Sequence, residues 1–178
     1  LYSSPSYSIN QLSNGMNDSE FQDLINDPDK PFFNRALQGR YPPASTIKPA
    51  IGMYGLSKDI VSWDFEMKDP GFFTLPETGR VFRGWLKGGH GKVDMHKAFL
   101  VSSNTYFFSL AYQADILELS NHLSNLGFGQ KVCLDCFDED QAFVPTPEWK
   151  YSSMNAGWVK GDTVNLGIGQ GYLVTTPM

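Results

Sequence analysis

Positively charged residues are few in this sequence. Its 178 residues include 14 Lys and Arg against 19 Asp and Glu, which gives a formal net charge of −5 at pH 7, and no basic stripe is present. Because nucleic-acid binding depends on clustered positive charge, we expect no nucleic-acid partner. An apolar run of 18 residues is also missing, so no segment is expected to cross a membrane. The length suits one domain with its own hydrophobic core.

Cysteine is scarce as well. The chain has two, Cys133 and Cys136, at a spacing that fits a redox pair or half of a zinc site. No second pair completes a four-thiolate site, and no helical pattern follows, as a redox motif requires. We therefore interpret them as two small apolar side chains near a strand.

Capping residues and helical periodicity predict most of the regular structure. Asp94 and Asp115 precede helical patterns, and Thr146 is a cap candidate followed by proline at the first helical position. Between residues 57 and 93 we expect a long irregular section, which inside a compact domain is usually functional. The expected helices span residues 19–25 (capped by Ser19), 45–56, 95–100, 105–113, 116–126 and a short segment after Pro147, and the expected strands span residues 72–75 and 162–168.

Ser45 and Lys48 open the helix expected over residues 45–56. Three residues apart, they share one helix face at an end where free N–H groups favour negative charge. A hydroxyl beside an amine in this setting is a candidate nucleophile with its base. A helix cap and a solvated lysine would give the same spacing. The apolar residues that follow favour a core helix, in which a lysine is paired or functional because its charge is costly to bury.

A second polar group lies 57 residues after Ser45. Ser102 and Asn104 fall at the junction of two expected helices, where a hydroxyl and an amide can reach both a buried lysine and a substrate amide. The Ser-x-Asn pattern alone is weak, since it also occurs at residues 8–10 and 153–155, where capping or turn formation explains it.

Taken in order, the two motifs resemble those of the penicillin-recognising serine transferases. Flanking segments narrow the resemblance to class B penicillin-binding proteins, and among them to elongation-type transpeptidases such as penicillin-binding protein 2. The likeness covers nearly the whole chain, and these segments provide it: Asn34-Arg35-Ala36-Leu37, residues 41–49, Asp69-Pro70-Gly71, residues 102–107 and Gly167-Ile168-Gly169-Gln170-Gly171-Tyr172.

The resemblance implies a mixed α/β (α+β) fold, with an antiparallel sheet flanked by helices. Lys-Thr-Gly or Lys-Ser-Gly, the third family motif, is absent after Asn104. We therefore expect residues 1–178 to form one partial transpeptidase domain that is rich in helices and lacks the C-terminal sheet strands, the membrane anchor and the pedestal domain. The family further implies a periplasmic domain at the bacterial inner membrane, partnered by a glycan polymerase, elongation-complex proteins and the rest of its own domain.

The resemblance also implies a role for each residue. Ser45 resembles the nucleophile acylated by the D-Ala-D-Ala end of a peptidoglycan stem peptide, and Lys48 resembles its base. Ser102 resembles the proton relay, and Asn104 the group that holds the substrate amide. β-Lactams imitate the substrate and stop at the acyl-enzyme. A fragment without the third motif is expected to acylate poorly alone.

Two further features depart from the family pattern. Ala44 replaces the usual glycine, which should matter little unless the residue requires a positive φ. Some relatives hold zinc near the second motif, and the matching positions here are Asp69, Gly84, His90 and Ser103. Because two of the four ligands are missing, we expect no structural zinc and no other cofactor.

Two other functions remain compatible with these motifs. A serine β-lactamase or β-lactam sensor would use the same scaffold, but a lactamase needs a base for the deacylating water. Residues 128–160 offer Glu139 and Glu148, one in a charged loop and one in the first turn of a helix, and neither setting is convincing. A non-catalytic scaffold for a glycan polymerase is the third possibility. The retention of Ser45, Lys48, Ser102 and Asn104 argues against it.

Overall fold

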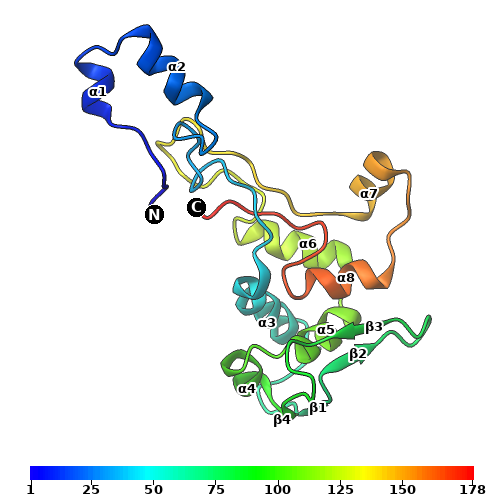
Figure 1. Ribbon diagram of the computed structural model, residues 1–178. Coiled ribbons are helices and arrows are strands. Elements are labelled where there is room, and N and C mark those ends of the chain that lie inside the picture. Colours follow the sequence, from blue (N-terminus) through cyan, green and yellow to red (C-terminus); the bar gives the residue numbers. More distant parts are fainter.

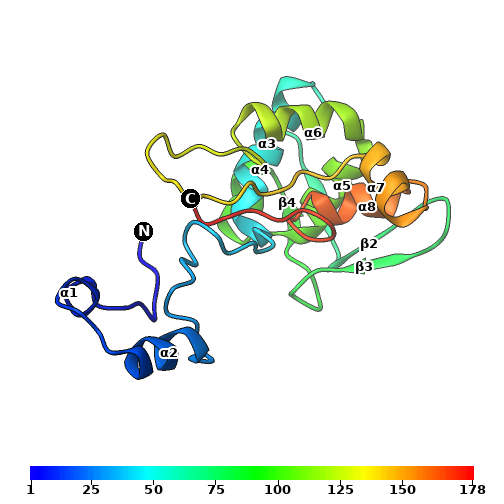
Figure 2. The same cartoon turned by 90° about the horizontal axis from the view of Figure 1, so that it is seen from above.

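A computed structural model describes residues 1–178 (Figure 1). The N-terminal arm holds α1 (Ile9–Ser13) and α2 (Asp18–Asn26) and projects away from the body of the molecule (Figures 1 and 2). Neither helix buries a residue. The predicted helix after residue 18 is confirmed, but its cap is Asn17 rather than Ser19. Asn17 and Glu20 form a reciprocal capping box, which satisfies two backbone N–H groups at the exposed helix start.

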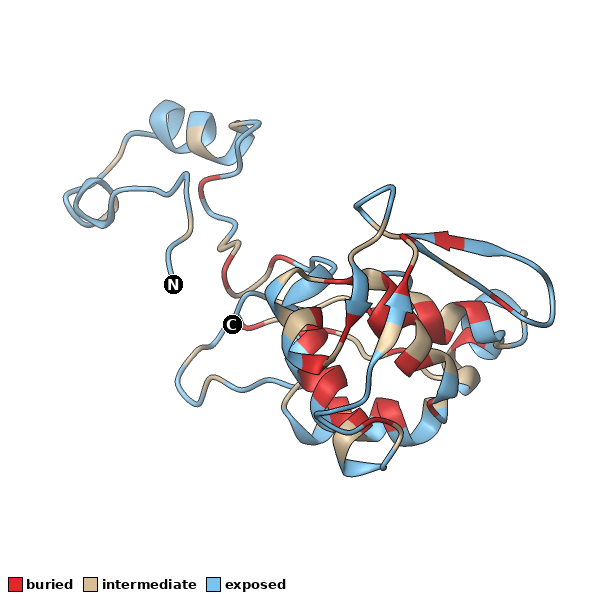
Figure 3. Ribbon diagram, turned by 90° about the horizontal axis from the view of Figure 1, so that it is seen from below, coloured by how far each residue is buried: buried red, intermediate tan, exposed pale blue.

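The body is built around a central buried helix, α5 (Asn104–Gln113). Six of its residues are buried, Phe107 completely, and α8 (Lys160–Leu166) packs against it. Buried residues concentrate in the helices of the body, whereas the arm is exposed (Figure 3). The other helical elements are η1 (Ala44–Ile47), α3 (Lys48–Ser57), α4 (Met95–Leu100), α6 (Ile116–Asn125) and α7 (Pro147–Met154). None of the helices is long and apolar enough to span a membrane.

Two small antiparallel sheets cover one side of α5. β1 (Met67–Asp69) pairs with β4 (Gly91–Val93), and β2 (Phe72–Thr74) pairs with β3 (Val81–Arg83). The section expected to be irregular therefore contains four short strands, of which only β2 was predicted. The β1–β4 register places Asp69 opposite Gly91, which brings His90 beside Asp69. Helices with small antiparallel sheets confirm the α+β class.

The strand predicted over residues 162–168 is wrong, because these residues lie largely in α8. Alternating apolar residues at 164, 166 and 168 imitate the period of a strand. They are buried because α8 is enclosed against α5. A Cβ on Gly167 would lie 2.3 Å from the Cβ of Ala111, so glycine permits the two helices to approach closely. Asp162 starts α8 by accepting the Val159 N–H at 3.0 Å.

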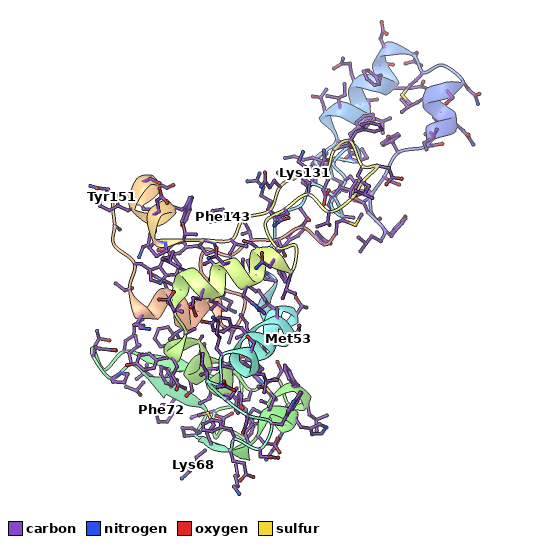
Figure 4. All side chains as sticks on the ribbon, turned by 180° about the vertical axis from the view of Figure 1, so that it is seen from behind. Met53, Lys68, Phe72, Lys131, Phe143 and Tyr151 are labelled. Carbon is purple, nitrogen blue, oxygen red and sulfur yellow. A yellow bond between two sulfur atoms is a disulfide. The ribbon has the colours of Figure 1, made fainter.

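The interpretation of the cysteines as unpaired apolar side chains is also wrong. Cys133 and Cys136 form a disulfide, with their Cα atoms 5.4 Å apart, in a loop outside the core. The buried Glu139 carboxylate accepts the N–H groups of Val132 and Cys133, both at 2.9 Å, and so closes the loop. Lys131 marks this loop near the base of the arm in Figure 4.

Candidate active site

Ser45 and Lys48 lie where the chain enters the body. Ser45 belongs to the 3₁₀ turn η1, and Lys48 is the first residue of α3, so the single α-helix expected from residue 45 begins with a 3₁₀ turn instead. Pro49 fits this helix start because its missing N–H would have no helical partner. The expected core character of α3 is confirmed, with Lys48 only 2% exposed, although Met53 lies on its outer face (Figure 4).

The Lys48 amine is surrounded by neutral oxygen acceptors. Its Nζ lies 2.9 Å from the carbonyl oxygen of Ser102, 3.0 Å from Ser102 Oγ and 2.7 Å from Asn104 Oδ1. The Phe107 ring lies beneath it, with the centroid at 5.4 Å. Because burial removes water and no carboxylate replaces it, the pKa of Lys48 falls to about 8. An amine with this pKa exists in part as a free base near neutral pH.

Ser102 connects the lysine to the candidate nucleophile. Its Oγ donates to Ser45 Oγ at 3.1 Å, while Lys48 bonds to the same Oγ. No direct hydrogen bond joins Lys48 to Ser45, so the hydroxyl of Ser102 is the link between them. Ser102 has a φ of 51° at the corner between α4 and α5, where Asn104 begins α5 one residue earlier than predicted. The structure thus brings together all four predicted residues.

An open cavity lies over this cluster. It has a volume of about 330 Å³ and is lined by Ser45, Lys48, Pro49, Phe99 and Ser102. Asn104 faces a second cavity of about 340 Å³, bounded mainly by β3 and by residues from α8 to Gln170. Ser102 thus lines one open space and Asn104 the other.

Ala44 meets the condition under which its replacement of glycine matters. Its φ is 49°, in the left-handed region that costs an L-residue with a side chain about 1–2 kcal/mol. Its N–H donates to the carbonyl of Gly169 at 2.9 Å, and a Cβ on Gly169 would lie 2.2 Å from the Ala44 carbonyl oxygen. This contact, which sequence reasoning missed, seats the residue before Ser45. The Gly-Gln-Gly segment was its only signal.

Three of the four positions that match the family's zinc site come together, but they do not suit a metal. Asp69 Oδ2 accepts hydrogen bonds from Ser103 Oγ at 2.7 Å and from His90 Nδ1 at 2.8 Å, and its Oδ1 accepts the Gly71 N–H at 2.7 Å. Gly84 offers no ligand atom. Among the side chains at these positions, His90 Nε2 is the one buried polar atom without a hydrogen-bond partner, whereas a structural zinc ion is bound by about four ligand atoms. Zinc therefore does not fit.

The carboxylate of Asp69 has hydrogen-bond partners without a metal. Burial raises the pKa of Asp69, but its hydrogen bonds, of which those from Ser103 and His90 contribute most, together outweigh burial and lower the pKa below its usual value. The carboxylate is thus ionised although it is only 2% exposed. Sequence reasoning identified these residues as remnants of a metal site and missed that they form a hydrogen-bonded cluster of their own.

This arrangement defines a class of protein: a helix-rich α+β domain in which a buried, partly neutral lysine is coupled through one serine to another serine. A comparison with protein families then identifies the family. The family described as penicillin binding protein transpeptidase domain matches residues 1–178. The chain belongs to this family.

Individual relatives agree with the family match. The chain is 44% identical to the peptidoglycan D,D-transpeptidase MrdA of Acinetobacter baumannii over 178 residues, all of this chain and 26% of that protein. Its fold matches the crystal structure of Pseudomonas aeruginosa PBP2 in complex with WCK 5153 at a TM-score of 0.93 and 39% identity, over 99% of this chain and 40% of that one. For PBP2 in the Helicobacter pylori complex with MreC, the TM-score is 0.91 at 32% identity, over 99% and 33% of the two chains. The chain spans about a quarter to two fifths of these relatives.

Proposed function

We propose that the protein is a serine-type peptidoglycan D,D-transpeptidase of cell-wall elongation, inhibited by β-lactams. One observation supports this most directly. Ser45 Oγ, Ser102 Oγ and Lys48 Nζ form a continuous chain of hydrogen bonds at 3.1 and 3.0 Å, and its terminal amine has a pKa of about 8. Such a chain removes a proton from a serine without histidine.

Acylation follows from this chain of hydrogen bonds. In the free-base form Lys48 accepts a proton from Ser102, and Ser102 in turn accepts the proton of Ser45 as Ser45 Oγ attacks the D-Ala-D-Ala carbonyl carbon. The tetrahedral intermediate then loses the C–N bond, and the leaving D-alanine nitrogen takes the proton back through Ser102. An ester on Ser45 and free D-alanine result. The attack by an amine of a second stem peptide reverses these proton transfers and forms the cross-link.

Two groups are suited to hold the substrate. Asn104 uses its Oδ1 on Lys48, which leaves its Nδ2 to donate to the peptide carbonyl of a stem peptide. The N–H of Ser45 lies in the first turn of η1, where no helical acceptor exists, and it provides one donor for the developing oxyanion. Asn104 thus positions the substrate and the Ser45 N–H stabilises the intermediate.

The candidate bases for a β-lactamase do not reach this site. Glu139 is buried in the disulfide loop, where it accepts two backbone N–H groups, and Glu148 lies in the first turn of α7. Neither forms a hydrogen bond with Ser45, Lys48, Ser102 or Asn104. The transpeptidase function is therefore favoured over a β-lactamase. Hydrolysis of the acyl-enzyme, a carboxypeptidase-type side reaction, is expected when water replaces the acceptor amine.

The family also suggests where the protein works. A relative at 32% identity is a PBP2 whose structure was determined in a complex with MreC. We propose that this protein likewise acts in the periplasm at the inner membrane, with elongation-complex proteins and a glycan polymerase as partners and in cell-shape maintenance. A role as an inert scaffold would not require a buried amine whose pKa is lowered to about 8.

Intact-mass spectrometry with penicillin tests the proposal. We expect the complete protein that contains this chain to gain one penicilloyl adduct on Ser45 and to keep it for many minutes. The Ser45→Ala variant should form no adduct. Loss of the adduct within seconds would instead indicate a β-lactamase. No adduct at all in the wild type would contradict an acylating function and favour the scaffold.

A further inference from the structure

We propose that Asp69 is a positioning residue: through Ser103 it fixes the corner that presents Ser102 and Asn104 to Lys48. The inference rests on the proposed function, because it concerns the same lysine. Asp69 touches neither Ser45 nor Lys48 by hydrogen bonding, so any effect on them passes through the corner.

The conformation of the corner, residues 102–104, explains why it needs an anchor, by which we mean the hydrogen bond from Ser103 to Asp69. Ser102 and Asn104 supply every hydrogen-bond acceptor of the Lys48 amine. Ser102 has a positive φ, a conformation that persists only where surrounding contacts enforce it. Ser103 lies between them and is fully buried. A small displacement of this residue therefore moves both groups that hold the lysine.

Ser103 is fixed by both hydrogen-bonding capacities of its hydroxyl group. Its Oγ accepts the Tyr106 N–H at 3.2 Å, which caps α5, and its proton is donated to Asp69 Oδ2 at 2.7 Å. The second bond is charge-assisted, and such bonds are about twice as strong as neutral ones. Because Asp69 is buried and ionised, loss of the Ser103 donor would leave charge partly unsatisfied, which resists movement of the corner.

Asp69 is held in place by the β1–β4 sheet. The Gly71 N–H occupies its Oδ1, and His90, brought beside it by the register of the two strands, donates from Nδ1 to Oδ2. The His90 ring packs against Trp85 at a centroid distance of 5.2 Å. Trp85 Nε1 in turn donates to the Val101 carbonyl at 3.2 Å. Two separate links from this sheet region thus reach residues 101 and 103, one on each side of Ser102.

The test measures acylation by a fluorescent penicillin in the complete protein carrying Asp69→Asn or Ser103→Ala. The amide of an asparagine at position 69 either turns its NH₂ group toward the Gly71 N–H or turns it toward Ser103, which then loses its acceptor. Alanine at position 103 removes the hydrogen bond to Asp69 without changing the charge. We expect acylation slowed at least tenfold in each. The apparent pKa of the rate should shift upward from about 8, because a displaced corner lets water reach Lys48.

Two further variants separate positioning from stability. Ser103→Thr keeps the hydroxyl group and should recover most of the rate. Asp115→Ala removes the cap of α6, where Asp115 Oδ1 accepts two N–H groups beyond the opposite end of α5 from the corner, and so weakens the fold through a comparable capping loss. It should leave the pH profile unchanged. Hydrogen exchange of residues 99–108 should increase in Ser103→Ala but not in Asp115→Ala.

The possible outcomes are distinct. Absence of acylation in the wild type contradicts the proposed function, and hydrogen exchange still tests the anchor. If the wild type is acylated and the folded Asp69→Asn and Ser103→Ala variants have the same rate and pH profile as the wild type, the positioning role of Asp69 is overturned. It is also overturned if Asp115→Ala shows the same shift in pH profile as these two variants. Stoichiometric zinc, whose removal by a chelator slows acylation like Ser103→Ala, would overturn it in favour of a metal site.

Discussion

The pH dependence of acylation gives the sharpest test of the role of Lys48. With a pKa of about 8, the amine is neutral in about one molecule in ten at pH 7, in about half at pH 8 and in about nine in ten at pH 9. The second-order rate constant for acylation follows the free enzyme. It should therefore rise about fivefold from pH 7 to 8, less than about twofold from pH 8 to 9, and then reach a plateau.

Stopped-flow mixing with a fluorescent penicillin measures this constant, with the hydrolysis of the reagent alone subtracted at each pH. A lysine with the ordinary pKa of 10.5 would instead give about a tenfold rise per pH unit up to about pH 10. A rate that keeps rising through pH 9.5, or that does not change with pH, would refute the role of the buried amine as the base. Lys48→Arg is the matched control, since a guanidinium keeps the positive charge and cannot act as a base in this range.

Three further changes test the surroundings of the site. Ala44→Gly should raise the free energy of unfolding by about 0.5–1 kcal/mol, because it releases the left-handed strain and the larger backbone entropy that glycine loses on folding offsets part of the gain. Gly169→Ala should destabilise the fold and slow acylation at least tenfold, since its Cβ would lie 2.2 Å from the Ala44 carbonyl oxygen. Reduction of the Cys133–Cys136 disulfide should cost up to about 2 kcal/mol for so short a loop and leave acylation unchanged, because no hydrogen bond links it to Ser45.

Urea unfolding and acylation of the same samples check all three. Ala50→Gly is the control for Ala44→Gly: it lies inside α3, where glycine should instead lower stability by about 1 kcal/mol or more. A lower stability of Ala44→Gly would contradict the strain argument. Normal acylation in Gly169→Ala would show that this contact does not seat Ser45, and slowed acylation after reduction would connect the disulfide loop with the site.

Local sequence signals predicted the helices that begin with a strong cap. Asp94, Asp115 and Thr146 each accept N–H groups at the starts of α4, α6 and α7, as expected. These signals suffice because a cap acts within one turn of its own helix. α8 was missed because the apolar residues that follow its first-turn carboxylate, Asp162, alternate as in a strand, and only packing against α5 makes a helix the better solution.

The cysteine pair and the short strands likewise could not be predicted from local sequence signals. Whether two thiols three residues apart pair with each other depends on the turn between them, which spacing alone does not specify. β1 and β4 are separated by more than twenty residues, so their pairing register is fixed by tertiary packing and not by either segment. That register then brings His90 to Asp69, a contact that the resemblance to the family's zinc positions suggested but that neither segment specifies by itself.

The residue types and their order by themselves determined the family and four candidate residues, because a nucleophile, a base, a relay and an amide are a choice of chemical groups. Only the tertiary structure decided how these groups act. It buried Lys48 and so lowered its pKa, placed Ser102 between the amine and Ser45, gave Ala44 a left-handed backbone, and attached Ser103 to Asp69. Each of these depends on segments far apart in the chain, and desolvation and hydrogen-bond geometry exist only once those segments are packed together.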